Sequence, residues 1–250
     1  MNLNFIKILM AVQVFFVLIN ESYSNSADSL NSDWSATVSL NGLYQSGNTN
    51  KIYISGKGEI KNSGKVIETI LASYLGYGES NNKKDNNDFY ATLTADLFYK
   101  NRWSPFLLQF VEFNYSSGID FRNQTGAGLK YIIIDSEEHK TSLSAACIYD
   151  YTNLTSKPGN SKKETSRLSV RFKTKQILFS GKLIFSFVSF YQPSFVNFAN
   201  AIFRCESILE IPVTKSIFVN AAYRYTDDDI VSAGRKRSDT KLTFGAGYKF

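Results

Sequence analysis

Charged residues recur at alternate positions in several stretches of this 250-residue sequence, as in the pairs Lys57 and Glu59 or Arg204 and Glu206. Alternate side chains of an extended strand point to the same face, so these charges would line one side of a sheet. Around a pore, such a lining could select an ion or a small solute. In a narrow barrel, the charges could instead pair with one another and stiffen the wall. Because the signs are mixed, the sequence predicts no ion preference and leaves both hypotheses open. The charged residues predicted to face the lumen are Lys57, Glu59, Asp96, Glu112, Asp120, Arg122, Asp150, Arg167, Arg171, Arg204, Glu206, Glu210 and Arg224.

Hydrolysis would need a nucleophile activated by a neighbouring base, and the chain has a single histidine, His139. It lies beside Glu137 and Glu138 in a predicted turn, at the opposite end of the predicted barrel from the long outer loops. An outer-membrane enzyme acting on lipid or peptide would therefore depend on outer-loop acids such as Asp227 and Asp228, and it is kept as an alternative hypothesis. A zinc site is equally poorly supplied with ligands. The sequence predicts no catalytic residue, no metal site and no cofactor.

Three consecutive aspartates, Asp227, Asp228 and Asp229, precede the basic run 235–237 in one predicted outer loop. Such a rim could bind divalent cations and the phosphates of lipopolysaccharide. Charged runs in loops are more often solvated, with opposite charges offsetting each other, and we favour that interpretation here.

Pairs of glycines separated by one residue occur at Gly56/Gly58, Gly76/Gly78, Gly126/Gly128 and Gly245/Gly247. A nucleotide-binding loop needs its glycines before a helix, and no helical periodicity follows these pairs. Within strands, paired glycines relieve crowding on one face and permit strong coiling. They therefore indicate sheet geometry rather than a nucleotide site.

The elements that would carry these residues are strands, because apolar and polar side chains alternate up to the last residue. The final stretch places Leu242, Phe244, Ala246, Tyr248 and Phe250 on one face. Alternation is weakest over residues 106–111, where most side chains are apolar. The pattern predicts about twelve strands, with approximate spans 33–46, 50–62, 65–79, 88–100, 104–117, 119–134, 140–153, 165–176, 181–192, 199–213, 216–227 and 238–250.

An apolar face without charges, next to a charged face, is typical of a transmembrane β-barrel whose outer side meets lipid. The predicted connections also alternate in length. Those on the side of the first strand's start are short, whereas residues 79–87, 154–164 and 228–237 are predicted to be long outer loops. The predicted fold is an all-β, antiparallel, up-and-down transmembrane β-barrel of about twelve strands.

Aromatic residues make up 15% of the chain, which is heavy for a soluble domain and ordinary for a membrane barrel. Trp34, Trp103 and Phe250 would lie at the same rim and form an aromatic girdle. The formal net charge is +6, but the basic clusters fall in predicted loops rather than along one face. That distribution argues against nucleic-acid binding.

The first two dozen residues have the features of a secretory signal peptide. Lys7 supplies a positive charge, residues 8–19 form an apolar run broken only by Gln13, and small residues around Ser24 offer a cleavage point. The run is too short to cross a bilayer as a helix, which needs about 20 apolar residues. We expect residues 1–24 to direct export and residues 25–250 to form the barrel.

The chain has two cysteines, Cys147 and Cys205. Export would permit a disulfide between them. Both fall in predicted strand interiors on the outward face, so we expect two unpaired, small apolar residues, with one disulfide as the alternative.

Several weak motifs occur in an order that resembles a known family. They are Trp34 before an alternating strand that ends in Gly47-Asn48-Thr49, then Ser104-Pro105-Phe106, then Asp120-x-Arg122 leading into Gly126-Ala127-Gly128, and a closing Gly-Tyr-Lys-Phe. This order is similar to that of the salt-induced outer-membrane proteins, which carry domain of unknown function 481. The resemblance covers nearly the whole mature chain and implies an outer-membrane barrel with no settled activity. Phe250 also resembles the C-terminal aromatic signal by which such chains reach the barrel-assembly machinery.

Together these observations predict a non-catalytic, integral outer-membrane protein of a Gram-negative cell, either a narrow channel or a structural, stress-related barrel. About twelve strands enclose a lumen wider than that of about eight strands, which side chains fill, and narrower than that of open porins with about 16–18. Expected partners are outer-membrane lipid, lipopolysaccharide and the barrel-assembly machinery, but not nucleic acid; the oligomeric state is left open. A soluble exported barrel that binds a ligand in its interior is a further alternative.

Overall fold

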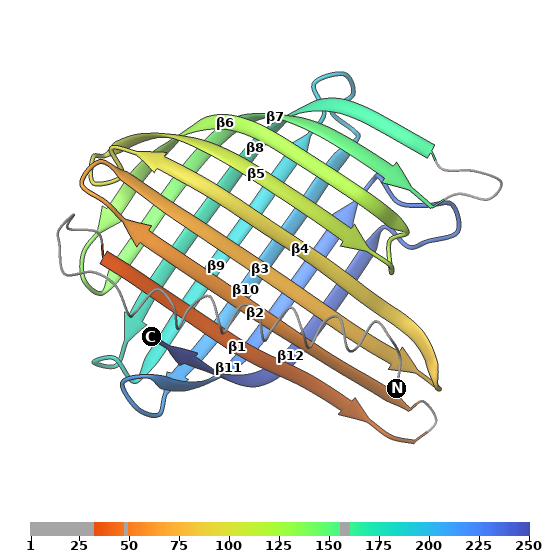
Figure 1. Cartoon of the computed structure of the whole chain (residues 1–250), viewed down its shortest axis with the longest axis horizontal. Coiled ribbons are helices and arrows are strands. Elements are labelled where there is room, and N and C mark those ends of the chain that lie inside the picture. Colours follow the sequence, from red (N-terminus) through yellow and green to blue (C-terminus); the bar gives the residue numbers. More distant parts are fainter. Residues whose placement is uncertain (1–32, 48–49, 156–160) are drawn as a thin grey trace, which may run out of the picture. The chain divides into compact units, whose positions relative to one another are not determined.

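The computed structural model describes residues 33–47, 50–155 and 161–250, and these residues form one closed β-barrel (Figure 1). The predicted signal peptide, residues 1–24, lies outside this part of the chain. Twelve strands run antiparallel and pair in sequence order, and β12 returns to pair with β1. The predicted all-β, antiparallel, up-and-down barrel of about twelve strands is confirmed.

The strands are 11 to 18 residues long, and most begin and end within a few residues of the predicted bounds. Because about 9–11 tilted residues cross the apolar core of a bilayer, every strand is long enough to do so. No helix in the described ranges is long and apolar enough to cross a membrane. The strands are β1 (Asp33–Gln45), β2 (Lys51–Ser63), β3 (Ile67–Ser80), β4 (Lys83–Leu97), β5 (Trp103–Asn114), β6 (Ile119–Asp135), β7 (His139–Leu154), β8 (Ser161–Leu178), β9 (Leu183–Pro193), β10 (Ala201–Pro212), β11 (Ile217–Asp228) and β12 (Ser238–Lys249).

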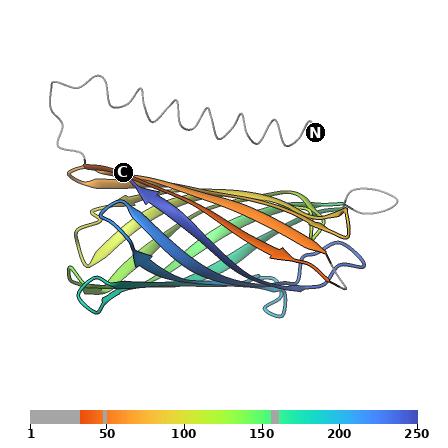
Figure 2. The ribbon, with the colours of Figure 1, turned by 90° about the horizontal axis from the view of Figure 1, so that it is seen from below.

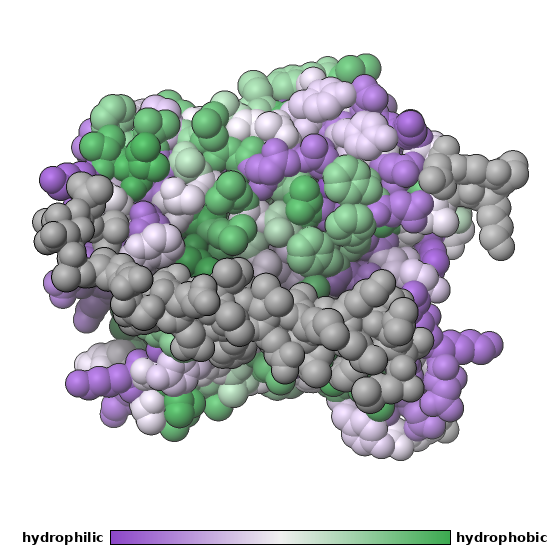
Figure 3. Space-filling view, viewed as in Figure 1, coloured by the Kyte–Doolittle hydropathy of each residue, from purple (hydrophilic) through white to green (hydrophobic). Residues whose placement is uncertain are grey.

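The barrel has a polar interior and an apolar outer surface. Its buried side chains are mostly polar or charged, including Arg122, Asp150 and Arg167, whereas large apolar side chains such as Leu107 and Phe244 are exposed. A soluble protein has the opposite distribution. In the view of Figure 3, hydrophobic side chains gather over the middle of the strands, and hydrophilic ones lie mainly toward the two ends.

Strand β5 explains the weak alternation of its sequence. Its inward face carries Phe106 and Leu108, which pack against Ala146 and Ile148 of β7 inside the barrel. Its outward face is also largely apolar, for example at Leu107. With apolar residues on both faces, the period-two pattern disappears although the strand is regular.

The two ends of the barrel differ in their connections (Figure 2). One end, here called the short-turn end, holds the connections after β2, β4, β6, β8 and β10, and the other is called the long-loop end. The longest connection of the long-loop end is residues 229–237, between β11 and β12. The start of β1 and the end of β12 both lie at the short-turn end.

The prediction of a long loop over residues 79–87 is wrong, because β3 ends at Ser80 and β4 begins at Lys83. The two turn residues, Asn81 and Asn82, have φ values of 49° and 59°. Positive φ at both positions is typical of a two-residue type I′ hairpin turn, in which Asn is well tolerated. These hairpin strands continue as polar sequence, so the alternation of apolar residues ends before the strands do.

Candidate functional site

The lumen holds charged residues whose contacts run across the barrel. Arg122 of β6 contacts Asp228 of β11, and Lys57 of β2 contacts Glu206 of β10. Neither pair of strands is adjacent in the sheet, so both contacts cross the interior. The pairing register places on the same inward face Glu59, Asp96, Glu112, Asp150, Arg167, Arg171, Arg204, Glu210 and Arg224.

A group of buried ion pairs, here called the mouth network, lies in the lumen toward the long-loop end. At its centre, Arg122 is fully buried. One of its terminal nitrogens, Nη1, donates to Asp228 at 2.6 Å and to Glu112 at 3.1 Å. Its Nε donates to the hydroxyl of Thr152 at 2.9 Å. The mouth network consists of Glu112, Arg122, Asp150, Arg167, Arg204 and Asp228.

Arg167 and Arg204 complete the mouth network. Arg167 is fully buried; its Nε donates to Asp150 at 2.7 Å, and its Nη1 donates to the backbone carbonyl of Asn200 at 3.1 Å. Arg204 Nη2 donates to Glu112 at 2.7 Å. Buried charges are tolerated when they are paired and hydrogen-bonded, as they are here. The mouth network therefore narrows the lumen at this level.

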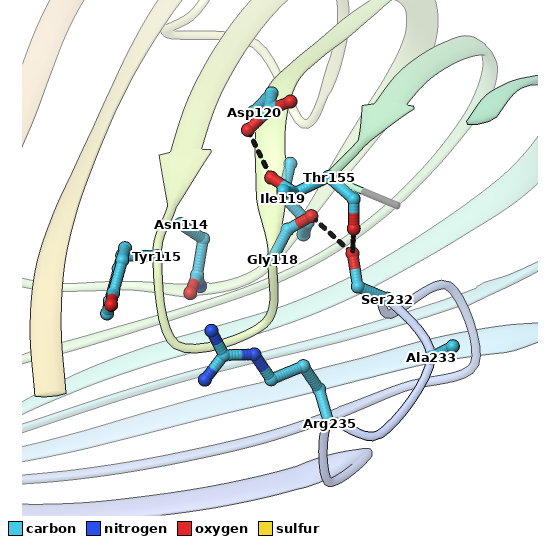
Figure 4. A pocket seen from close by; sticks show the side chains of 9 residues that line it. All are labelled: Asn114, Tyr115, Gly118, Ile119, Asp120, Thr155, Ser232, Ala233 and Arg235. Atoms are coloured by element: carbon cyan, nitrogen blue, oxygen red, sulfur yellow. Dashed lines mark hydrogen bonds between the residues drawn. The ribbon is translucent and has the colours of Figure 1, made fainter. Parts of the chain in front are cut away.

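Residues 229–237, here called the closing loop, fold over the mouth of the barrel. The hydroxyl oxygen of Ser232 lies within hydrogen-bond distance of the carbonyls of Gly118 and Thr155, at 2.7 Å and 2.6 Å (Figure 4). In the strand order, these partners lie on the opposite side of the ring from β11 and β12, so the loop spans the opening. Ile230 of the loop is buried against apolar residues of that wall, Ile119 and Leu154.

Asp120 does not face the lumen, contrary to the prediction. The register between β6 and β7 shifts between Ile119 and Phe121, so that Ile119 is buried and Asp120 is exposed. A bulge of this kind adds one residue to a strand and reverses the alternation, which the sequence pattern does not reveal. The carboxylate of Asp120 accepts a hydrogen bond from Thr155 and lines a cavity of about 340 Å³ between the closing loop and the β5–β6 connection (Figure 4).

Farther down the lumen, Glu206 joins strands that are not neighbours. Its carboxylate lies 2.5 Å from Lys57 Nζ and 2.8 Å from Arg224 Nη2. The guanidinium of Arg224 also lies 4.0 Å from the centre of the Tyr74 ring and 5.1 Å from that of Tyr90. Such cation–π contacts hold the arginine against the opposite wall.

The half of the lumen toward the short-turn end is more open to solvent. Glu59 is exposed there, and it forms no ion pair with any described residue. The other carboxylates of this half each contact a lysine, in the pairs Asp96–Lys130, Glu68–Lys61 and Glu210–Lys249.

Strand β8 adds two cations to this half that the sequence analysis missed, Lys173 and Lys175. Both are exposed, and they follow Arg171 on the inward face. Arg171 itself donates to Ser144 at 3.1 Å and lies over the ring of Phe106. The alternate spacing from Arg171 is the sequence signal that identifies both lysines.

Aromatic side chains gather at the short-turn rim. Trp34, Trp103 and Phe250 are 69%, 58% and 42% exposed, respectively. The Trp103 ring lies 4.6 Å from that of Tyr131, and the Phe250 ring lies 4.6 Å from that of Tyr248. These two tyrosines extend the set that the sequence analysis named.

The residues considered for catalysis lie at opposite ends of the barrel. His139 begins β7 at the short-turn end, where its Nδ1 lies 2.6 Å from Gln176 Oε1. At the long-loop end, Asp228 is buried in the mouth network and Asp227 lies 3.6 Å from Arg237. Among the residues that the structure describes, no group of three or more His, Cys, Asp or Glu is placed to hold a metal ion.

The fold is similar to that of porins. The NanC porin superimposes with a TM-score of 0.54 at 14% sequence identity, over 86% of this chain and 100% of that chain. The KdgM porin gives 0.43 at 11% identity, over 86% and 99%. The translocator domain of the autotransporter NalP from Neisseria meningitidis gives 0.42 at 11% identity, over 96% of each chain. No curated protein matches the sequence. The family model described as "Protein of unknown function, DUF481" matches residues 36–250, nearly the whole barrel, and the chain therefore belongs to the DUF481 family.

Proposed function

We propose that the barrel is an integral protein of the outer membrane, exported under the direction of residues 1–24. Its exposed apolar surface, its long strands and its aromatic rim support this location. A charge in the middle of the lipid-facing surface costs roughly 2–4 kcal/mol, and the charged residues of the strands lie mainly in the lumen or near the ends. Outer-membrane barrels have short turns in the periplasm and longer loops outside the cell. The short-turn end therefore faces the periplasm, and the long-loop end faces lipopolysaccharide.

Within that membrane, the geometry supports best a narrow channel that is closed at its outer mouth. The contrast between the two halves of the lumen carries this proposal. Arg122 and Arg167 are fully buried near the mouth, whereas Lys173 and Lys175 are exposed near the periplasmic end. Charges that line a water-accessible passage are typical of a channel, because they act on the solutes that pass.

The mouth network and the closing loop together close the outer mouth. Of the two, the closing loop is the part that could move without unfolding the barrel. Asp228 N donates to Arg237 O at 3.0 Å, so the two strands are already joined at the base of the loop. The loop body contacts the far wall mainly through Ile230 and Ser232. Breaking these contacts would leave the strand pairing intact.

A structural role is the second candidate, and the mouth network favours it. Contacts such as Arg122–Asp228 tie strands that the sheet does not pair. A barrel whose opposite walls are tied in this way resists deformation, whether or not a solute ever crosses it.

Conductance of the purified protein in a planar bilayer separates the two functions. We would compare the native chain with a variant in which an Asn-Gly turn replaces residues 229–236, since that pair favours two-residue hairpins. Lys236→Gln is the matched control, because it neutralises one exposed charge and leaves the loop in place. We expect rare, small openings in the native protein and in the control, and longer-lived openings in the shortened variant, because the mouth network alone then narrows the lumen.

Folding must be verified independently, for example by the faster migration of unheated barrel on a detergent gel. If the shortened variant folds and shows no conductance, the channel proposal fails and the structural role is left. If the native protein already conducts steadily, the barrel is a channel but the closing loop does not close it.

A further inference from the structure

We propose that Arg171, Lys173 and Lys175, here called the β8 ladder, bind small organic dianions in the periplasmic half of the lumen. The inference rests on the proposed channel only in its claim that such anions are the solutes the barrel conducts. The binding site itself depends on the side chains of one strand and on the charges that face them.

The β8 ladder presents positive charge at regular steps. Its three residues alternate along β8 on the inward face, which separates successive Cα atoms by about 6.5–7 Å. Lys173 and Lys175 are exposed to solvent in the lumen, and Arg171 is half-buried above them. A solute entering from the short-turn end therefore meets the two ammonium groups before it reaches the guanidinium.

The strands on either side of the ladder offer it no acid. On β7, the residues directly opposite the ladder are Ser144, Ser142 and Lys140. On β9 they are Phe190, Val188 and Ser186. Opposite charges on adjacent strands normally stabilise each other, and that compensation is missing here. The flanking serine hydroxyls can instead donate hydrogen bonds to an anion.

The carboxylates on the facing walls are mostly engaged elsewhere. The acids that act electrostatically on the ladder are Glu59 and Glu68 on Lys173, Asp96 on Arg171, and Glu210 on Lys175. Three of these four acids are in contact with lysines of other strands, and Glu59 is the one that forms no ion pair with a described residue. Within the described chain, no residue of the β8 ladder forms an ion pair. This half of the lumen therefore has positive charge that its own acids do not neutralise.

The spacing favours an anion with two charged groups. A single ion pair in contact with water contributes little, because solvent screens it. A solute with two carboxylate or phosphate groups can contact two residues of the β8 ladder at once. The second contact then forms without a second loss of translational freedom. Cations are repelled by the same charges, and neutral solutes gain nothing from them.

Calorimetric titration of the folded protein in detergent at low salt tests the site. The probes are adipate, a flexible dicarboxylate, pyrophosphate, and the neutral analogue adipamide. The test variant is Lys173→Gln/Lys175→Gln. Its matched control is Lys182→Gln/Lys215→Gln, which removes the same charge from exposed turns at the same end of the barrel.

We expect adipate to bind the native protein and the control with the same Kd, and to bind the ladder variant at least about tenfold more weakly. Added salt should weaken binding, because these charges are in contact with water. Binding of pyrophosphate as well as adipate indicates a general site for anions with two charged groups, and binding of adipate alone indicates a carboxylate site. Both results support the proposal.

Equal binding by the ladder variant and the native protein would overturn the inference, as would equally tight binding of adipamide. Failure of adipate to bind would do the same, whether or not pyrophosphate binds. Because the titration requires no conductance, its outcome is separate from that of the channel proposal. If the barrel shows no conductance but binds adipate through the β8 ladder, only the channel proposal is overturned. If the barrel conducts but does not bind adipate in this way, only the proposal of anion binding by the β8 ladder is overturned.

Discussion

Among single residues, Arg122 is the one on which the mouth network most depends. It is fully buried, it contacts Glu112 and Asp228, and its Nε lies 3.8 Å from Asp150. Without its guanidinium, three carboxylates would face one another in a space with little water. Such an arrangement is costly because each carboxylate loses hydration and is repelled by its neighbours.

The substitution Arg122→Met should therefore lower the free energy of unfolding by about 3–5 kcal/mol, the usual cost of removing one partner from a buried ion pair. Arg237→Gln is the control, since Arg237 is exposed and pairs with Asp227 and Asp229 at the rim. That change should cost less than about 1 kcal/mol. Urea unfolding in lipid vesicles, followed by tryptophan fluorescence, measures both. Equal losses in the two variants would show that the mouth network adds no stability of its own.

At this scale the sequence predicts the face on which a charge lies, but not its partner. Alternation is enough to place Arg122 and Asp150 on one face of their strands. It cannot predict that Arg122 meets Asp228, because that contact depends on how the sheet closes. It also fails at Asp120, where a bulge reverses the alternation. Lys173 was within reach of the same pattern that identified Arg171.

Among the strands, the closure between β1 and β12 depends on a glycine, Gly245, which has no side chain. Asn41 of β1 lies opposite Gly245 of β12, which lies opposite Asn220 of β11. The amide of Asn41 donates to that of Asn220 across the glycine. A Cβ at Gly245 would overlap the carbonyl oxygen of Leu40 and the side chain of Asn41. Gly245 thus allows three strands to be tied together where the barrel closes.

Gly245→Ala should weaken closure by roughly 1–3 kcal/mol, the usual cost of forcing an extra methyl group into a packed site. Gly56→Ala is the matched control, because the atom nearest to its added Cβ would be 3.9 Å away. The measurement is the temperature at which the compact band disappears on a detergent gel. We expect a clear decrease for Gly245→Ala and little change for Gly56→Ala. The same temperature for both variants would mean that closure tolerates a side chain at this position.

The strands themselves were largely predictable, because membrane and water impose opposite demands on alternate residues. Prediction was poorest where that contrast is lost. The inward face of β5 is apolar through Phe106 and Leu108, so the pattern lost its phase. Residues 79–87 are polar on both faces, so two strand ends were interpreted as a loop. The bilayer thus specifies the middle of each strand better than its ends.

For the whole molecule, the asymmetry of the lumen is the property on which the proposed channel most depends. One half holds buried, paired charges under a loop, and the other exposes cations to solvent. Neither composition nor alternation distinguishes these halves, because both contain lysine, arginine and carboxylates. The difference arises from which strands face each other across the closed ring. It could not be predicted before the register of all twelve strands was known.

The exposed Cys147 allows the membrane location of the whole barrel to be tested. Cys147 is unpaired and exposed on the outer surface, so it would react readily if that surface were in water. In lipid vesicles we expect a charged, membrane-impermeant maleimide to leave Cys147 unlabelled, because lipid covers it, and to label it after unfolding in urea. In a Cys147→Ala/Cys205→Ala background, Lys173→Cys should be labelled without unfolding, because the lumen holds water there. If Cys147 reacts as fast in intact vesicles as in urea, the outer surface lies in water and the barrel is not a membrane protein. If Lys173→Cys stays unlabelled, the lumen is closed at both ends, and neither a passage nor a ladder for anions can operate.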